Sequence, residues 1–276
     1  MTQSLDRQEP RVMITRRANL PIVSSTLAPS RESFFCARPW TGFEVEENGE
    51  VKMCCWAKKI YGNVNEQTIE DMWNGRAIKE FRLKMARGEW ADICKPHCPV
   101  IAGYTKDTPH PKEPLNDTFS SNLERNLAEI AGRKLELESL PRFWKIAHST
   151  LCNLDCVMCY QDRKSKHQLP ASFYHEMKQY YPNIQELLLI GGEPLVIKEI
   201  RRLMNEFPTE RCPDTKLALI TNGTIFDDNT MALAARVSLL GVSLDRRRKP
   251  RDLRSHKKTW RAFAYLGWDQ SVEKAE

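Results

Sequence analysis

The stretch Cys152-Asn-Leu-Asp-Cys156-Val-Met-Cys159 places three thiols in one short loop, directly after the apolar run 143–147. Three thiolates do not complete the tetrahedral shell of a zinc ion, although a fourth ligand such as His148 could. They can instead hold three irons of a cubane cluster and leave the fourth iron open to a small molecule. The sequence therefore indicates a metal site and leaves both a cluster and zinc open.

Apolar runs alternate with segments of helical spacing through residues 141–245. The candidate strands are Phe143–Ala147, Glu186–Ile190, Lys216–Thr221 and Val237–Leu244, and the candidate helices are Ala171–Tyr181, Ile197–Phe207 and Asp227–Ala235. This alternation predicts parallel βα units, hence an α/β domain. Ligands of such domains bind at the carboxyl ends of the strands, where the cysteine loop begins.

Further motifs follow the other candidate strands in order. Gly191-Gly192-Glu193-Pro194 follows the second strand, Thr221-Asn222-Gly223 ends the third, and Ser243-Leu244-Asp245 ends the fourth; Tyr160 follows the last cysteine of the loop. This ordered set resembles the radical S-adenosylmethionine (SAM) superfamily. The resemblance implies a fold of the α/β class, a partial (β/α) barrel of the radical SAM type.

The same resemblance implies roles for these residues. Cys152, Cys156 and Cys159 would bind a 4Fe-4S cluster, whose open iron would be chelated by the amino and carboxylate groups of S-adenosyl-L-methionine. Gly191, Gly192 and Glu193 would hold the SAM amino group, and Tyr160 would lie near the adenine through its backbone. Asn222, Ser243 and Asp245 would contact the ribose or methionine part. The resemblance itself names no residue that contacts the substrate.

Five further cysteines lie in an N-terminal group, at positions 36, 54, 55, 94 and 98. The runs Phe43–Glu47 and Glu50–Cys54 flank Asn48-Gly49, which is a strong hairpin signal. Helical spacing follows in Thr68–Trp73 and Ala77–Ala86, with Arg82 at the edge of the second apolar face. We therefore expect a small α+β module that is rich in cysteine.

Twelve residues separate Cys36 from Gly49, and four separate Gly49 from Cys54. With Cys94 and Cys98, this spacing resembles the SPASM or shorter twitch module, which implies a second, auxiliary 4Fe-4S cluster on Cys36, Cys54, Cys94 and Cys98. A structural zinc ribbon would use the same ligand types and stays open. Because Cys55 adjoins Cys54, one of the two must point elsewhere, and the spacing favours Cys54. His97 is interpreted as a solvated loop residue.

The chain has 276 residues, of which 41% are apolar and 28% charged, a composition typical of a protein with a packed core. It contains neither an apolar run long enough to span a membrane nor the apolar core of a signal peptide. We therefore expect a cytoplasmic protein. Clustered cysteines in a reducing compartment indicate metal or redox sites rather than disulfides, and the isolated Cys212 reads as an incidental thiol.

Most of the formal net charge of +6 comes from 246–261, which holds nine Lys or Arg and one acid, Asp252. A basic segment of this kind can be a solvated end or a nucleic-acid arm. No aromatic-interleaved stacking module accompanies it, so the sequence favours the solvated end and makes nucleic acid an improbable partner.

The expected organisation is a disordered leader over 1–31, the auxiliary module over 32–100, a linker and helix over 101–140, the core over 141–245 and a basic tail over 246–276. The linker helix is placed at Leu123–Leu137, and the aromatic residues of 260–268 could form an amphipathic helix. The family barrel has about six βα units. The four strands found here predict an incomplete core, from a truncated reading frame or a core completed by a partner chain.

The first functional hypothesis is a radical SAM enzyme that cleaves SAM reductively to a 5'-deoxyadenosyl radical and modifies a peptide, a protein or a small molecule. Such an enzyme would take its electron from an external donor, and a membrane is not expected as a partner. The alternative is a non-catalytic iron–sulfur or zinc-binding protein left by truncation.

Overall fold

The structure is a computed structural model that describes residues 34–101, 114–161, 167–225 and 227–243, together with the backbone of Phe263–Leu266. The expected leader 1–31 lies outside the described residues, as do Asp245 and most of the linker and basic tail.

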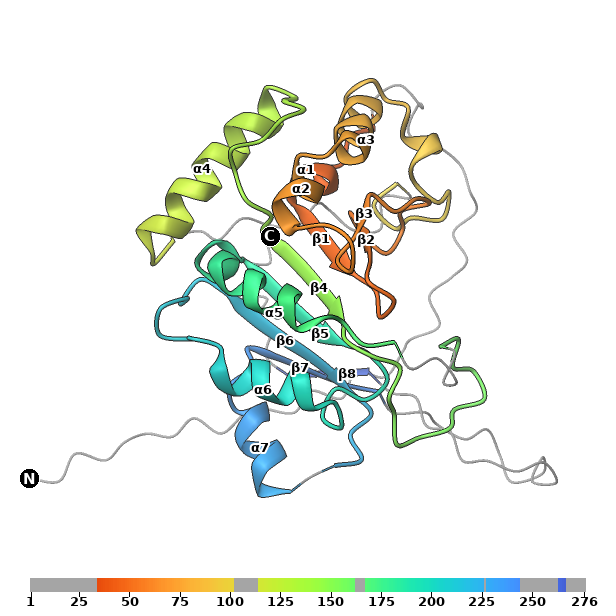
Figure 1. Ribbon diagram of the computed structural model, residues 1–276, viewed down its shortest axis with the longest axis vertical. Helices are drawn as coiled ribbons and strands as arrows, with labels where there is room; N and C mark the ends of the chain where they lie inside the picture. The colour runs from red at the N-terminus through yellow and green to blue at the C-terminus, as the bar shows by residue number, and fades with distance from the viewer. Residues whose placement is uncertain (1–33, 102–113, 162–166, 226, 244–262, 267–276) are drawn as a thin grey trace, which may run out of the picture.

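All strands join one sheet, in the order β3-β2-β1-β4-β5-β6-β7-β8 (Figure 1). Their bounds are β1 Gly42–Val45, β2 Glu50–Lys52, β3 Gly62–Asn63, β4 Phe143–Ala147, β5 Glu186–Ile190, β6 Lys216–Thr221, β7 Leu239–Ser243 and β8 Phe263–Leu266. Strands β1, β4, β5, β6 and β7 are parallel neighbours, while β2, β3 and β8 pair antiparallel. The predicted α/β class with a largely parallel sheet is confirmed.

The helices that connect β4 to β7 cover one face of the sheet, as Figure 1 shows for α5, α6 and α7. This follows because parallel neighbours in sequence order, joined by crossovers of one hand, place every connecting helix on the same side. The covered face is apolar and fully buried at Trp144, Ile146, Leu187 and Leu189. The opposite face of β5 is only half-buried, the asymmetry expected of a partial barrel.

The helices are α1 Arg38–Thr41, α2 Ile69–Trp73, α3 Arg76–Ala86, α4 Asp117–Ala131, α5 Ala171–Met177, α6 Lys198–Glu206 and α7 Asp228–Ala234, with 3-10 turns at Trp90–Asp92 and Lys178–Asn183. The start of α2 is fixed by Thr68, whose hydroxyl accepts a hydrogen bond from the backbone N–H of Asp71 in a capping box. Strands β1 and β2 form the expected hairpin, in which Gly49 takes φ +87°.

Two expected helices differ from the structure. The linker helix begins at Asp117 rather than Leu123 because the Asn116 side chain caps it, and it ends at Ala131, before Arg133 takes a left-handed φ of 51°. The prediction of an amphipathic helix over 260–268 is wrong for its central residues, 263–266. Phe263–Leu266 instead form β8, whose backbone pairs antiparallel with β7 and so extends the sheet.

The module and the core share the sheet. Strand β1 of the cysteine-rich module pairs parallel with β4, from Gly42 opposite Phe143 to Val45 opposite Ile146. The rings of Phe43 and Trp144 pack on each other with centroids 4.5 Å apart. The two cysteine groups are therefore held on one continuous scaffold.

Candidate functional site

Three loops at the carboxyl ends of β4, β5 and β6 are tied to one another by hydrogen bonds. The backbone N–H of Gly192 donates to the Ser149 carbonyl at 2.8 Å, and the N–H of Glu193 donates to the Leu151 carbonyl at 2.8 Å. These bonds join the loop after β5 to the start of the cysteine loop. The motifs that the sequence predicts to act together are therefore in contact.

Glu193 ties the loop after β5 to the loop after β6. Its carboxylate is fully buried and accepts from the backbone N–H of Leu195 at 3.0 Å, the hydroxyl of Thr221 at 2.7 Å and the backbone N–H of Asn222 at 2.6 Å. Buried carboxylates are stable when they are hydrogen-bonded in this way. What the structure shows for Glu193 is a positioning role, and its expected contact with the SAM amino group stays a prediction.

Asn222 connects the loop after β6 to the cysteine loop. Its side-chain amide donates to Asn153 Oδ1 at 2.9 Å and lies 3.8 Å from the Cys152 sulfur. The Asn153 amide in turn donates to the Thr224 hydroxyl at 2.8 Å. Asn153 and Thr224 were missed by the sequence analysis; the signal that could have found them is that Asn153 lies within the cysteine loop and Thr224 directly follows Gly223.

Gly192 is required by the packing of these loops. A Cβ atom at this position would lie 2.2 Å from the Leu151 carbonyl oxygen, well inside van der Waals contact. The neighbouring Gly191 is half-buried beside it. Glycine at position 192 therefore lets the loop after β5 pack closely against the start of the cysteine loop. The expected contact of SAM with Gly191 and Gly192 stays a prediction.

The remaining predicted core residues are more open. Cys152 and Cys156 are half-buried and Cys159 is exposed, with the backbone N–H of Cys159 donating to the Cys156 carbonyl at 3.0 Å. Tyr160 is 90% exposed, so its ring is available to a ligand. Ser243 ends β7 half-buried. The described contacts do not bring Tyr160 or Ser243 to the loops around Cys152.

His148, the possible fourth zinc ligand, is 1% exposed and lies on the side of β4 that faces α5. Its Nδ1 is 2.6 Å from the Tyr174 hydroxyl, and the two rings are stacked. Burial lowers the pKa of His148 to about 3, so the imidazole is neutral near pH 7. The side chain is thus engaged in the helix layer.

The second cysteine group surrounds a cavity of about 220 Å³ in the N-terminal module. Its lining includes all five cysteines of the group: Cys36, Cys54, Cys55, Cys94 and Cys98. The segment after β2 and the closing loop are held together by an antiparallel bridge between Ala57 and Cys94. The structure therefore brings together the four predicted ligands of the auxiliary site.

The thiols of Cys54 and Cys94 both have raised pKa values. Burial first, and then the charges of Glu44, Cys36 and Cys55, raise the pKa of Cys54 to about 12 against a backbone hydrogen bond from Trp56. The pKa of Cys94 is likewise raised to about 12 by burial, then by Cys54 and Cys98.

Cys55 has a different environment. Burial and then Glu44 raise its pKa, while Lys145 and Arg38 lower it. Glu44 raises the pKa of both thiols, so these charges do not distinguish the two cysteines. Cys54 is half-buried, whereas Cys55 is exposed and also lines a polar pocket with Lys145, and Cys54 stays the predicted ligand.

The donor set fits the groups that the sequence implies. Four cysteines around one cavity, and three in one loop, are the soft ligands that iron–sulfur clusters use. Within the described ranges, no three His, Cys, Asp or Glu side chains lie close enough to hold a single metal ion. A cubane spreads its thiolates over separate irons, so its ligands lie farther apart than those of one tetrahedral ion.

A charged cluster lies between the two cysteine groups and was missed by the sequence analysis. Lys145 of β4 pairs with Glu44 of β1 and lies 3.8 Å from Glu46, which also lies 3.5 Å from Lys52. Burial lowers the pKa of Lys145, but the carboxylates of Glu44 and Glu46 outweigh it and raise the pKa overall. The available signal was a lysine inside an otherwise apolar strand.

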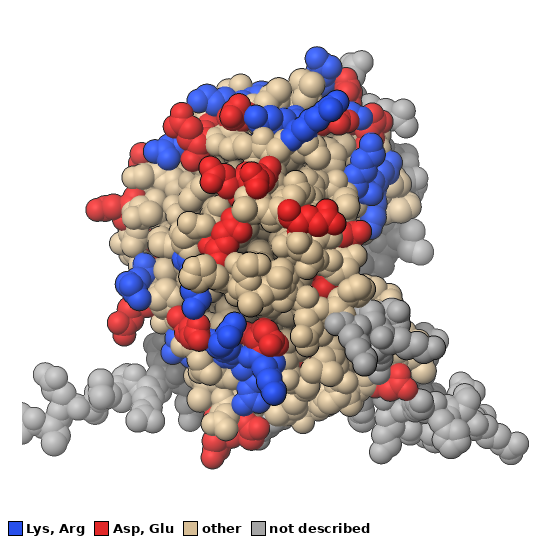
Figure 2. Space-filling model, in the orientation of Figure 1, with Lys and Arg blue, Asp and Glu red and all other residues tan. Residues whose placement is uncertain are grey.

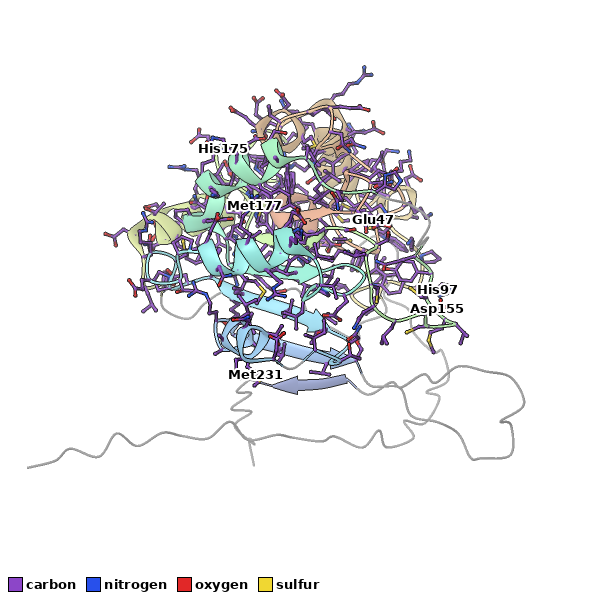
Figure 3. All side chains as sticks on the ribbon, turned by 60° about the horizontal axis from the view of Figure 1, so that its bottom comes forward. Glu47, His97, Asp155, His175, Met177 and Met231 are labelled. Carbon is purple, nitrogen blue, oxygen red and sulfur yellow. The ribbon has the colours of Figure 1, made fainter. Side chains whose placement is uncertain are left out.

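Figure 3 places Glu47 of the hairpin, His97 of the closing loop and Asp155 of the core cysteine loop toward the same end of the molecule. His97 is exposed, as the sequence predicts. On the face shown in Figure 2, acidic and basic side chains are intermixed. Among the described residues, no helix combines the length and apolarity that crossing a bilayer requires.

Comparison with known families agrees with this geometry. Residues 146–262 match the Radical SAM superfamily, and residues 36–99 match SPASM, an iron–sulfur cluster-binding domain. The chain therefore combines a SPASM iron–sulfur domain with a radical SAM domain, and the resemblance inferred from the motifs is confirmed. The Radical SAM match covers less than half of the chain, and members of that superfamily are generally enzymes. A search of the curated proteins finds no match.

Among solved structures, the chain is similar to Streptococcus suis SuiB bound to its precursor peptide SuiA, with 19% identity and a TM-score of 0.33. It is also similar to Streptococcus suis SuiB bound to S-adenosylmethionine, with 21% identity and a TM-score of 0.32. Each alignment covers 61% of this chain and 37% of the SuiB chain, so this chain spans well under half of that length.

Proposed function

We propose that this chain binds a 4Fe-4S cluster through Cys152, Cys156 and Cys159 and cleaves S-adenosyl-L-methionine reductively. The joining of the cysteine loop to the Gly191-Gly192-Glu193 and Thr221-Asn222 loops carries this proposal. When bound, the cluster and SAM supply one-electron cleavage of a carbon–sulfur bond, which yields a 5'-deoxyadenosyl radical able to abstract hydrogen from a substrate. An external donor supplies the electron.

The chain's own residues position these groups. Glu193 fixes Asn222, and Asn222 fixes the start of the cysteine loop next to Cys152. In the proposed complex, Gly191, Gly192 and Glu193 would hold the SAM amino group, Tyr160 would lie near the adenine through its backbone, and Asn222 and Ser243 would contact the ribose or methionine part. Orientation of this kind is the main contribution of a protein to cofactor chemistry.

We further propose that Cys36, Cys54, Cys94 and Cys98 hold a second, auxiliary 4Fe-4S cluster. The cavity that these cysteines line supports the assignment. A peptide or protein is the favoured substrate class because auxiliary modules accompany such substrates in relatives; a small molecule is the alternative. The reduced thiols that both clusters require favour the cytoplasm as the location.

The test is anaerobic reconstitution of the full chain with iron and sulfide, followed by reduction in the presence of SAM. We expect about eight irons per chain for two 4Fe-4S clusters, and formation of 5'-deoxyadenosine. Replacing Cys152, Cys156 and Cys159 by alanine should remove about half of the iron and all of the 5'-deoxyadenosine. Cys212→Ala, outside both groups, is the control. A fully loaded chain that forms no 5'-deoxyadenosine would show a non-catalytic iron–sulfur protein instead.

A further inference from the structure

A polar pocket of about 380 Å³ lies at the joint between the auxiliary module and the core. It is lined by the hairpin residues Glu46, Glu47, Asn48, Glu50 and Lys52, by Cys55 and Lys95 of the module, and by Lys145 and Tyr160 of the core. Cys55 also lines the auxiliary cavity, and Tyr160 follows the core cysteine loop. The pocket therefore lies between the two cysteine groups.

The lysines of this pocket are occupied by groups of the chain itself. Lys145 is held by Glu44 and Glu46, and Lys52 lies 3.5 Å from Glu46. Lys95 donates to the Cys55 carbonyl at 3.5 Å. Two of the three lysines are thus paired with carboxylates, and Lys95 is the one pocket lysine without an acidic partner among the described residues.

Two carboxylates of the pocket, by contrast, have no lysine or arginine partner among the described residues. Glu47 and Glu50 are half-buried, and neither forms an ion pair with any residue in the part of the chain that the structure describes. A cationic group that enters the pocket can therefore form charge-assisted hydrogen bonds with two carboxylates that make no ion pair within the described residues.

An aromatic ring adds a second attraction for a cation. Tyr160 lines the same pocket and is 90% exposed. The carboxylate-bearing residues Glu46, Glu47 and Glu50 line this pocket together with the ring. An exposed aromatic face beside carboxylates is a suitable site for an ammonium or guanidinium group.

From these contacts we infer that the pocket formed by Glu47, Glu50 and Tyr160 binds an organic cation, namely the lysine or arginine side chain of the substrate. The assignment of this cation to the substrate rests on the proposed function. The binding of a cation by the pocket does not. The ligand would approach both the core cysteine loop and the wall of the auxiliary cavity from this position.

The test measures binding to the full, anaerobically reconstituted chain by calorimetry. The probes are acetyl-Gly-Lys-Gly-amide and its arginine, norleucine and glutamate counterparts. We expect the lysine and arginine peptides to bind about tenfold more tightly than norleucine, and glutamate to bind weakest. A preference for glutamate would overturn the inference, because the lysines would then define the pocket.

The double variant Glu47→Gln, Glu50→Gln should reduce the preference for the lysine peptide over the norleucine peptide to about twofold or less. The pair Glu66→Gln with Glu89→Gln removes the same charge at exposed positions of the module outside the pocket and should leave the preference intact. Equal losses in both pairs would overturn the inference, since a general change in net charge would explain them. S-adenosylhomocysteine should not displace the lysine peptide; displacement would assign the pocket to SAM.

Cleavage of SAM without peptide separates this inference from the proposed function. The Glu47→Gln, Glu50→Gln chain should form 5'-deoxyadenosine within twofold of the unmodified chain, because no described hydrogen bond or ion pair links either carboxylate to Cys152, Glu193 or Asn222. Selective peptide binding without any SAM cleavage would refute the proposed function and keep the cation site. Cleavage without lysine preference would refute the cation site and keep the function.

Discussion

At the scale of single residues, Glu193 shows how one buried carboxylate can hold two loops in place. Replacing it by glutamine keeps its shape but turns one acceptor into a donor that faces an N–H or hydroxyl group. We expect Glu193→Gln to lower the free energy of unfolding by roughly 1.5–3 kcal/mol, measured by anaerobic urea denaturation. The exposed Glu210→Gln serves as control. Equal stability of the two variants would show that the carboxylate does not hold the loops.

The adjacent pair Cys54 and Cys55 allows a direct test of the auxiliary site. Cys54→Ser should lose about half of the reconstituted iron and sulfide, because it removes a thiolate from the cavity. Cys55→Ser should keep both, since the spacing from Gly49 selects Cys54 and Cys55 is the more exposed thiol of the pair. Iron and sulfide analysis of the two proteins, prepared side by side, decides the assignment. The reverse pattern would make Cys55 the ligand.

His148 gives the protein an acid-sensitive point. Its pKa is about 3 in the folded chain and about 6.5 when unfolded, so the unfolded state binds more protons between these values. The stability that the neutral imidazole contributes is therefore complete above pH 6.5 and is lost as the pH falls toward 3.

We expect unfolding free energy to fall by about 2 kcal/mol more between pH 7 and pH 5 in the unmodified chain than in His148→Gln. Urea denaturation at the two pH values measures the difference. The exposed His175→Gln should behave like the unmodified chain. A pH response that His148→Gln leaves unchanged would assign the acid sensitivity to other groups.

The loops around these residues show which features of the site could be predicted from the sequence and which could not. The motif order places the three loops at one end of the sheet because side chains after neighbouring parallel strands must meet there. It does not reveal that Glu193 is buried, or that Asn153 contacts Asn222, because such contacts depend on how the loops pack. The pocket around Lys145 depends on which strand lies next to β4, which local periodicity does not encode.

At the scale of elements, local patterns fix the strands better than the helix ends. The candidate strands Phe143–Ala147, Glu186–Ile190 and Lys216–Thr221 have the bounds of β4, β5 and β6. Helix α4 begins six residues earlier than expected, because a single polar cap at Asn116 outweighs the apolar stripe. The helix expected near the C-terminal end is replaced by β8, since pairing with β7 is a non-local choice.

Arg82 joins the short elements of the module. It was expected at the edge of α3, but the structure buries it fully, where burial lowers its pKa to about 10. Its guanidinium donates to the carbonyls of Pro39, Trp73 and Leu135 and to the Asn74 side chain. This one side chain therefore satisfies acceptors from α1, α2 and the segment before β4.

Replacing Arg82 by methionine should leave these acceptors without donors. We expect Arg82→Met to lower the free energy of unfolding by about 3 kcal/mol, measured by urea denaturation of the full chain. Arg76→Met, at an exposed position of the same helix, should change it by less than about 0.5 kcal/mol. Similar losses in both variants would attribute the effect to helix propensity rather than to the buried guanidinium.

At the scale of the whole molecule, the continuous sheet implies that the auxiliary module and the core unfold together. Besides the β1–β4 pairing, the Trp40 indole donates to the Lys134 carbonyl at 2.7 Å and the Trp73 indole donates to the Ser139 carbonyl at 2.7 Å. These bonds cross from the module to the segment that leads into β4. The chain is therefore not two independent units joined by a linker.

Hydrogen exchange with mass spectrometry in increasing urea can test this cooperativity. Peptides that cover β1 and β4 should lose protection at the same urea concentration, because the two strands are backbone partners in one sheet that continues through β2 on one side and β5 on the other. Phe43→Ala removes a fully buried ring that packs on Trp144 and should lower both midpoints together, by about 3–5 kcal/mol of stability. Ile60→Ala, at a 43% exposed position of the module, should move neither much. If Phe43→Ala released β1 while β4 stayed protected, the two cysteine sites would rest on separable scaffolds, and the pocket between them would not have fixed walls.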